Sequence, residues 1–160
     1  MHRSTWNRRS ILIAASMTAV LTGALFGTAG RAHADEFLDV DEAFKVDAEG
    51  TPNHDLRINF AVAEGYSLYK DRITIIVKTP GINTGRVDYP PSETHTDEFF
   101  GPQQVYTHDV SLEVPISCAP GASVSIIVTV TYQGCADAGL CYPFQKKELK
   151  VELPDGTCTG

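Results

Sequence analysis

Apolar and polar residues alternate one by one in four separate runs of the chain, which is the pattern of β-strands with one buried face. The runs cover residues 56–63, 110–116, 124–132 and 149–153. A fifth run, residues 73–77, alternates less and is rich in isoleucine and valine, so we expect that strand to be covered on both faces. No window after the N-terminal segment repeats apolar residues at helical spacing. The chain is therefore predicted to be all-β.

Turn-forming residue pairs separate these runs. The pairs are Glu64-Gly65, Pro80-Gly81, Pro90-Pro91, Gly101-Pro102 and Pro120-Gly121. Short strands at this spacing indicate an immunoglobulin-like antiparallel β-sandwich of about seven or more strands, with a β-barrel as the alternative. The polar stretch between Tyr89 and Gly101 is expected to be a loop.

The N-terminal segment has the three-part pattern of a secretory signal peptide. A basic start containing Arg8-Arg9 leads into an apolar stretch, residues 11–26, and an Ala-His-Ala sequence ending at Ala34 matches a signal-peptidase site. The apolar stretch is shorter than the about 20 residues of a membrane span, so a retained anchor is the less favoured alternative. We expect cleavage after Ala34 and export to the periplasm.

Cleavage at that point divides the chain into a signal peptide, residues 1–34, and one domain, residues 35–160. Arg8-Arg9 also resembles a twin-arginine signal, which leaves the export route open. The 13 basic residues lose four with the signal peptide and the 20 acidic residues lose none, so the domain carries a formal net charge of −11. Such a surface disfavours nucleic acid and anionic membranes as partners.

All four cysteines lie in the predicted domain, and an exported protein makes disulfides the default expectation. Four cysteines allow three pairings. A Cys118–Cys158 bridge would close about 40 residues and stabilise the fold by roughly 3.9 kcal/mol, whereas a Cys135–Cys141 bridge would close about seven and give roughly 2.4 kcal/mol. The longer loop makes the better staple, so we expect Cys118–Cys158 to hold the C-terminal tail.

Cys135 and Cys141 lie in the segment Tyr-Gln-Gly-Cys-Ala-Asp-Ala-Gly-Leu-Cys-Tyr-Pro, into which an alternating run leads directly. Rigid strands would keep both sulfurs close after reduction, so that the bridge could open and close reversibly. A plain structural bridge explains the spacing equally well, and both roles stay open. Zinc is disfavoured because no Cys-x-x-Cys is present and the histidines lack ligand spacing. No cofactor motif is found.

The segment Thr129–Pro143 closely resembles the active-site hairpin of the N-terminal periplasmic domain of the thiol:disulfide interchange reductase DsbD. Three further segments agree with that family in order and spacing. Residues 37–44 (FLDVDEAF) look like its opening, residues 64–70 (EGYSLYK) its Gly-Tyr-x-Leu-Tyr turn, and residues 97–101 (DEFFG) its cap loop. The likeness covers nearly the whole predicted domain.

The resemblance implies a carrier of reducing equivalents on an immunoglobulin-like sandwich. Its electron donor would be a thioredoxin-like domain or protein served by a membrane-embedded partner. Its acceptors would be periplasmic disulfide isomerases and the cytochrome c maturation pathway. Carried over by motif, Cys141 would form the mixed disulfide with partners and Cys135 would resolve it. The other implied site residues are the cap ring Phe99, its acidic neighbours Asp97 and Glu98, and the lining residues Tyr66, Tyr69 and Tyr142.

The sequence also departs from the family. It ends at Gly160 without the family's later domains, so we expect a separate donor, for example a CcdA-like membrane protein with a periplasmic thioredoxin, or else a fragment of a longer protein. Ser67 stands where an aromatic residue is common, and Cys118 and Cys158 are not part of the motif. A monomer is expected. The rival functions are an exported binding module with two structural disulfides and an oxidant sensor or scavenger.

Overall fold

The computed structural model describes residues 37–97, 101–155 and 157–158, so the predicted signal peptide lies outside the described residues. Within them the chain forms a short helix, α1 (Val40–Ala43), one 3-10 turn, η1 (Lys70–Arg72), and strands. The strands are β1 (Phe44–Gly50), β2 (Asp55–Val62), β3 (Tyr66–Tyr69), β4 (Thr74–Val77), β5 (Ile82–Thr84), β6 (Glu93–Asp97), β7 (Gly101–Tyr106), β8 (Val110–Cys118), β9 (Ser125–Tyr132), β10 (Gly134–Ala136) and β11 (Gln145–Glu152). None of the described helices has the length and apolarity needed to cross a membrane.

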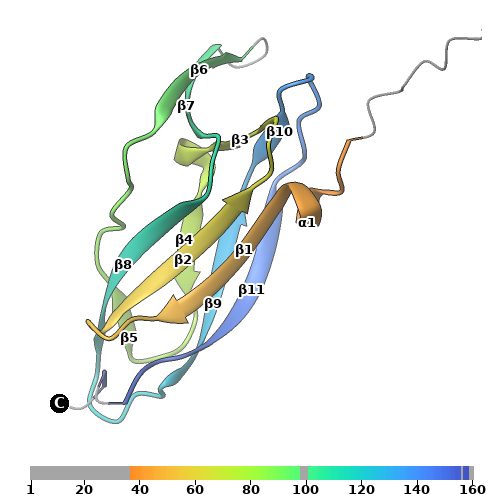
Figure 1. Ribbon diagram of the computed structural model, residues 1–160. Helices are drawn as coiled ribbons and strands as arrows, with labels where there is room; N and C mark the ends of the chain where they lie inside the picture. Colours follow the sequence, from red (N-terminus) through yellow and green to blue (C-terminus); the bar gives the residue numbers. More distant parts are fainter. Residues whose placement is uncertain (1–36, 98–100, 156, 159–160) are drawn as a thin grey trace, which may run out of the picture. The chain divides into compact units, whose positions relative to one another are not determined.

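The strands pair into three antiparallel sheets (Figure 1). One sheet has the order β1-β2-β8-β5, the second β11-β9-β4, and the third β10-β3-β7-β6. The first two form the two layers of the sandwich, and the third lies at the upper end in Figure 1. This arrangement confirms the predicted immunoglobulin-like antiparallel β-sandwich.

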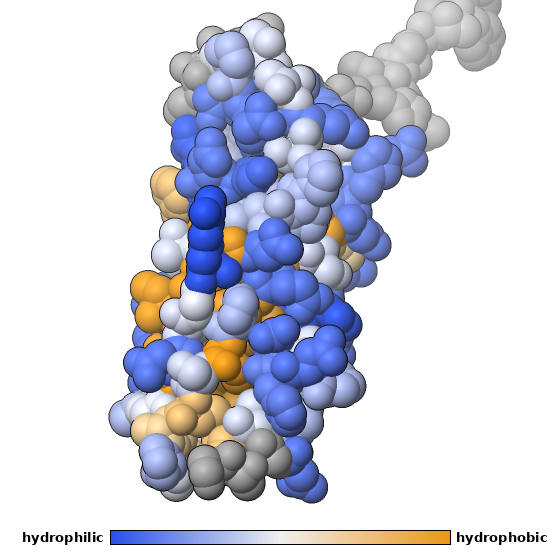
Figure 2. Space-filling view, turned by 90° about the vertical axis from the view of Figure 1, so that its left-hand side faces the viewer, coloured by the Kyte–Doolittle hydropathy of each residue, from blue (hydrophilic) through white to orange (hydrophobic). Residues whose placement is uncertain are grey.

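The core lies between the two layers, where the alternating runs point their apolar faces. Leu56, Ile58 and Phe60 of β2 are almost completely buried, and so are Val128 and Val130 of β9. Their polar neighbours along each strand lie on the opposite face, as the two-residue repeat of a strand requires, and of these Thr129 is also buried. On the face seen in Figure 2, hydrophobic side chains also reach the surface in the middle, between hydrophilic regions.

Two of the predictions about local structure are wrong. Residues 73–77 are not covered on both faces: β4 is an edge strand, and Ile76 on its outer face is 52% exposed. The stretch expected to be a loop contains β6, which pairs with β7 along its whole length. The side chains described in β6 are all exposed, so the strand has no apolar face from which it could have been predicted.

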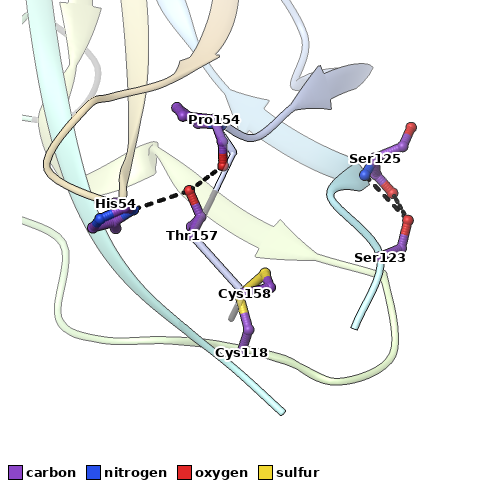
Figure 3. Close-up of a disulfide and its surroundings, with 7 residues drawn as sticks. All are labelled: His54, Cys118, Ser123, Ser125, Pro154, Thr157 and Cys158. Carbon is purple, nitrogen blue, oxygen red and sulfur yellow. Dashed lines mark hydrogen bonds between the residues drawn. A yellow bond between two sulfur atoms is a disulfide. The ribbon is translucent and has the colours of Figure 1, made fainter. Parts of the chain in front are cut away.

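The C-terminal tail is fixed to the end of β8 by the predicted Cys118–Cys158 disulfide, whose Cα atoms are 5.0 Å apart. Figure 3 shows that the bridge lies beside two hydrogen bonds of Thr157: its hydroxyl donates to the Pro154 carbonyl at 2.7 Å and lies 3.1 Å from His54 Nδ1. His54 belongs to the turn before β2, so the tail is tied both to this turn and to the end of β8. This end of the domain is opposite the sheet that contains β10 (Figure 1).

Replacing both Cys118 and Cys158 with serine is expected to lower the free energy of unfolding by about 3–4 kcal/mol, because the unfolded chain regains the entropy of an open loop of about 40 residues. Denaturant titration of the oxidised protein measures the loss. Thr157→Ala, which keeps the bridge and removes only the hydroxyl contacts, is the control and should cost about 1 kcal/mol. A loss of less than about 1 kcal/mol in the double serine variant would contradict the assignment of this bridge as the main staple.

Candidate functional site

Cys135 and Cys141 face each other across the last hairpin. Cys135 is the middle residue of β10, and Cys141 forms an isolated antiparallel bridge with it. The two sulfurs form a disulfide, and the Cα atoms are 4.0 Å apart. The pairing inferred from loop entropy is thus present for all four cysteines. Since β10 also pairs with β3, Cys135 lies opposite Ser67.

The backbone between the two cysteines is closed by its own hydrogen bonds. The Ala136 amide donates to the Leu140 carbonyl at 2.7 Å, and the Gly139 amide donates to the Ala136 carbonyl at 2.9 Å. Gly139 has φ +100°, a conformation that side-chain-bearing residues rarely adopt. The Tyr142 amide then donates to the Gly134 carbonyl at 3.1 Å, just outside the ring. These bonds do not involve the sulfurs, so they can persist when the disulfide is opened.

The two sulfur-bearing residues differ in accessibility. Cys135 is 4% exposed and packs against the buried side chains of Tyr69 and Val105, whereas Cys141 is half-buried at the edge of the same cluster. An attacking thiolate from outside can therefore reach Cys141 more readily than Cys135.

A surface hollow of about 310 Å³ opens beside the disulfide. Its lining residues come from β3, β6 and the last hairpin: Ser67, Tyr69, His95, Thr96, Cys135, Ala136, Asp137, Ala138, Gly139 and Cys141. Ser67 Oγ donates to Asp137 Oδ1 at 3.0 Å across this hollow. The Ser67 side chain thus ties β3 to the turn between the cysteines.

His95, Thr96 and Asp137 were not predicted as site residues. The two β6 residues reach the hollow through the pairing of β6 with β7 and of β7 with β3, which the sequence did not indicate. Asp137 lies between the cysteines, so its position was available in the sequence, but its contact with Ser67 depends on the register of β10 with β3. Within the described part of the chain, no three His, Cys, Asp or Glu side chains group closely enough to hold a metal ion.

The predicted site residues divide into three groups. Tyr69 lies with the cysteines, as expected. Tyr66 and Tyr142 do not line the hollow; they stack on each other, with centroids 6.3 Å apart, and both contact the Phe44 ring edge to face. Glu98 and Phe99 lie outside the described residues. Asp97 is the last residue of β6, and the residue before it, Thr96, lines the hollow.

Gly134 allows the Phe44 ring to pack directly beneath the hairpin. A Cβ atom at this position would lie 2.3 Å from Phe44 Cζ and under 3 Å from two further ring carbons. Phe44 itself is 1% exposed and has Tyr66, Tyr132 and Tyr142 around its edges. The residue before the first site cysteine is thus in direct contact with the core.

A network centred on Gln133 braces the strand that leads into the hairpin. Its backbone carbonyl accepts from the Tyr69 amide at 3.0 Å, and its side-chain amide donates to the Tyr142 carbonyl at 2.9 Å. Arg72 donates to the Gln133 side-chain oxygen and lies over the rings of Tyr69 and Phe144, at 5.2 and 5.9 Å from their centroids. These distances are within the range of cation–π interactions.

The hydroxyl of Tyr142 remains protonated at any physiological pH. Burial, the hydrogen bond with Tyr66 and the Asp39 carboxylate together raise the pKa of Tyr142 to about 12. The protonated hydroxyl donates to the carbonyl of Leu38, in the segment that precedes α1.

Comparison with known proteins identifies the family. Residues 34–153 match the family model described as thiol:disulfide interchange protein DsbD, N-terminal. The chain belongs to this family. It is 38% identical over 116 residues to DsbD 1 of Pseudomonas aeruginosa and 37% identical over 142 residues to DsbD of Escherichia coli O157:H7. These matches cover 72% and 89% of this chain but only 19% and 23% of the two relatives, so the chain spans about a fifth of their length.

Solved structures agree with this assignment. The reduced DsbD N-terminal domain of Neisseria meningitidis superimposes with a TM-score of 0.64 at 31% identity, covering 72% of this chain and 90% of that domain. A complex between the DsbD and PilB N-terminal domains of the same organism gives a TM-score of 0.57 at 28% identity, over 72% of this chain and 88% of the matched chain. The fold described above is therefore that of the DsbD N-terminal domain family.

Proposed function

We propose that residues 35–160 form a periplasmic thiol–disulfide exchange domain that passes reducing equivalents from a thioredoxin-like donor to oxidised proteins. The observation that carries the proposal is the Cys135–Cys141 bridge itself: one of its cysteines is buried, the other is half-buried beside an open hollow, and both lie within the residues that match the family model. Acceptors of the kind the family implies are disulfide isomerases and thioredoxin-like proteins of cytochrome c maturation.

Reduction of the domain proceeds through Cys141. A donor thiolate attacks Cys141 Sγ, the Cys135–Cys141 bond breaks, and Cys135 leaves as a thiolate that takes a proton from water. The donor's second thiolate then attacks the donor sulfur that is bonded to Cys141, and Cys141 leaves as a thiolate that takes a proton from water. The donor dithiol becomes a disulfide, and the domain gains two electrons and two protons.

Delivery to an acceptor is the same sequence in reverse. The Cys141 thiolate attacks one sulfur of the acceptor disulfide, and the other acceptor sulfur leaves as a thiolate. The Cys135 thiolate then attacks Cys141 Sγ and releases the bonded acceptor sulfur as a thiolate. Because the hairpin keeps the two Cα atoms close through backbone hydrogen bonds, this last step is intramolecular and fast. We further propose that Phe99 shields the pair between encounters, and that Asp97 and Glu98 raise the pKa of the thiols by disfavouring the thiolate.

A redox titration of the folded protein tests the proposal. The protein is equilibrated in graded buffers of dithiothreitol, the free thiols are alkylated, and each cysteine is quantified by peptide mass spectrometry. We expect Cys135 and Cys141 to open together at a potential well above about −300 mV, as a working exchange pair does. The Cys118–Cys158 bridge serves as the internal control and should stay closed at that potential.

Opening of both bridges together, only below about −300 mV or only on unfolding, would contradict the exchange function. The remaining function would then be that of an exported binding module with two structural disulfides.

A further inference from the structure

The backbone of Leu38 is bound on both sides by tyrosine hydroxyls. Its amide donates to Tyr66 Oη at 2.8 Å, and its carbonyl accepts a hydrogen bond from Tyr142 Oη. The two tyrosine rings are stacked, with an interplanar angle of 27°. A single peptide segment ahead of α1 therefore joins two aromatic side chains that are 76 residues apart in the sequence.

These two tyrosines adjoin the two ends of the disulfide ring. Tyr142 directly follows Cys141 in the chain. Tyr66 lies opposite Ala136, the residue that directly follows Cys135, in the pairing of β3 with β10. The segment at Leu38 is itself held in place, since α1 carries Asp41, whose carboxylate forms an ion pair with Lys147 of β11 at 2.5 Å.

We propose that Leu38, Tyr66 and Tyr142 form a clamp that keeps Cys135 and Cys141 together after the disulfide has been opened. These are positioning residues: none of the three lines the hollow beside the sulfurs. The proposal rests on the exchange function above, and it assigns to the segment before α1 a part in setting the redox equilibrium.

The physical reason lies in the reduced state. In the oxidised protein the covalent ring already holds the hairpin, so the clamp adds little to the distance between the sulfurs. In the reduced protein the Cys141 end can move away from β10 unless other contacts restrain it. Restraint raises the effective concentration of one thiol near the other, which favours the disulfide. Loss of the clamp should therefore shift the equilibrium toward the dithiol.

The test is the equilibrium constant between protein and dithiothreitol, measured for Tyr142→Phe and Tyr66→Phe. Each variant keeps its ring and loses its hydrogen bond to Leu38, together with the one between the two tyrosine hydroxyls. We expect a shift of at least about fivefold toward the dithiol for each, the size of one hydrogen bond. Tyr89→Phe is the matched control: it also removes a hydroxyl that donates to a backbone carbonyl, that of Ile73, but away from the hairpin. Its equilibrium constant should equal that of the unmodified protein.

Leu38→Pro separates the clamp from a local effect of the tyrosines. Proline lacks the amide that donates to Tyr66, so in the Leu38→Pro background Tyr66→Phe removes only the contact between the two hydroxyls and should cause a clearly smaller shift than in the unmodified protein. Leu38→Ala, which keeps the amide, controls for loss of a side chain that is 38% exposed. Thermal unfolding of each oxidised variant verifies that the fold is intact.

The possible outcomes are distinguishable. If the unmodified pair titrates but the tyrosine variants do not shift, the clamp is wrong and the exchange function stands. A full additional shift from Tyr66→Phe in the Leu38→Pro background would also refute the clamp. If the pair of the unmodified protein cannot be titrated in the folded state, both the exchange function and the clamp fail.

Discussion

A Cys135→Ser variant is expected to accumulate as a stable mixed disulfide, with a lifetime at least about 100-fold longer than that of the unmodified protein, because no second thiol remains within reach of Cys141. The reaction partner is a single-cysteine variant of a thioredoxin-like protein. Its remaining cysteine is activated as a mixed disulfide with thionitrobenzoate. Attack by Cys141 releases thionitrobenzoate and joins the two proteins. Absorbance follows the first step, and non-reducing electrophoresis follows the survival of the product.

Cys141→Ser is the matched control. It removes the half-buried cysteine and leaves only Cys135, which is 4% exposed beneath Tyr69 and Val105, so release of thionitrobenzoate should be slower by about 100-fold. Both variants keep the Cys118–Cys158 bridge, so their stability should be similar. Equal trapping by the two variants, or faster trapping through Cys135, would mean that the order of attack assigned to the cysteines is wrong.

The long strands of the sandwich were predictable because each has one face in the core. β2, β8, β9 and β11 cover the four alternating runs except for one terminal residue in three of them, and their buried residues are those of the apolar face, with Thr129 as the exception. β11 begins at Gln145, before its apolar residues, since its pairing with β9 extends beyond the core. Two shorter strands were not predicted: β6 consists of polar residues, and β10 has only three residues.

The position of the cysteine pair was predictable from spacing and from the family motif, but the architecture around it was not. The pairing Cys135–Cys141 and the packing of Tyr69 against it follow from a tight hairpin next to β3. Tyr66 and Tyr142 were expected to line the site because they lie close to it in the sequence or the motif. Their rings instead contact Phe44, and their hydroxyls bind the backbone of Leu38. These contacts depend on the register between β3 and β10 and on the position of Leu38, which is about 30 residues from Tyr66 and about 100 from Tyr142 in the sequence.

The second large effect concerns the contact between Gly134 and Phe44. Gly134→Ala is expected to lower the free energy of unfolding by about 1–3 kcal/mol, since the new methyl group would overlap the Phe44 ring and the buried ring has little room to move. Phe44→Ala is expected to cost about 3–5 kcal/mol through lost burial and the cavity left behind. Denaturant titration of the oxidised variants measures both values.

The double variant gives the sharper result. All three nearest atoms to a Cβ at residue 134 belong to Phe44, and the backbone of Gly134 does not have positive φ, so the ring is the nearest obstacle to an alanine there. In the Phe44→Ala background, Gly134→Ala should therefore be neutral or slightly stabilising, because alanine restricts the unfolded chain more than glycine does. Phe60→Ala is the control background: Phe60 is as buried as Phe44 but is not among the nearest neighbours of Gly134, so there the alanine should keep its full cost. Additive losses in the Phe44→Ala background would show that residue 134 is glycine for a reason other than this contact, and the ring would then have no direct part in supporting the hairpin that carries Cys135.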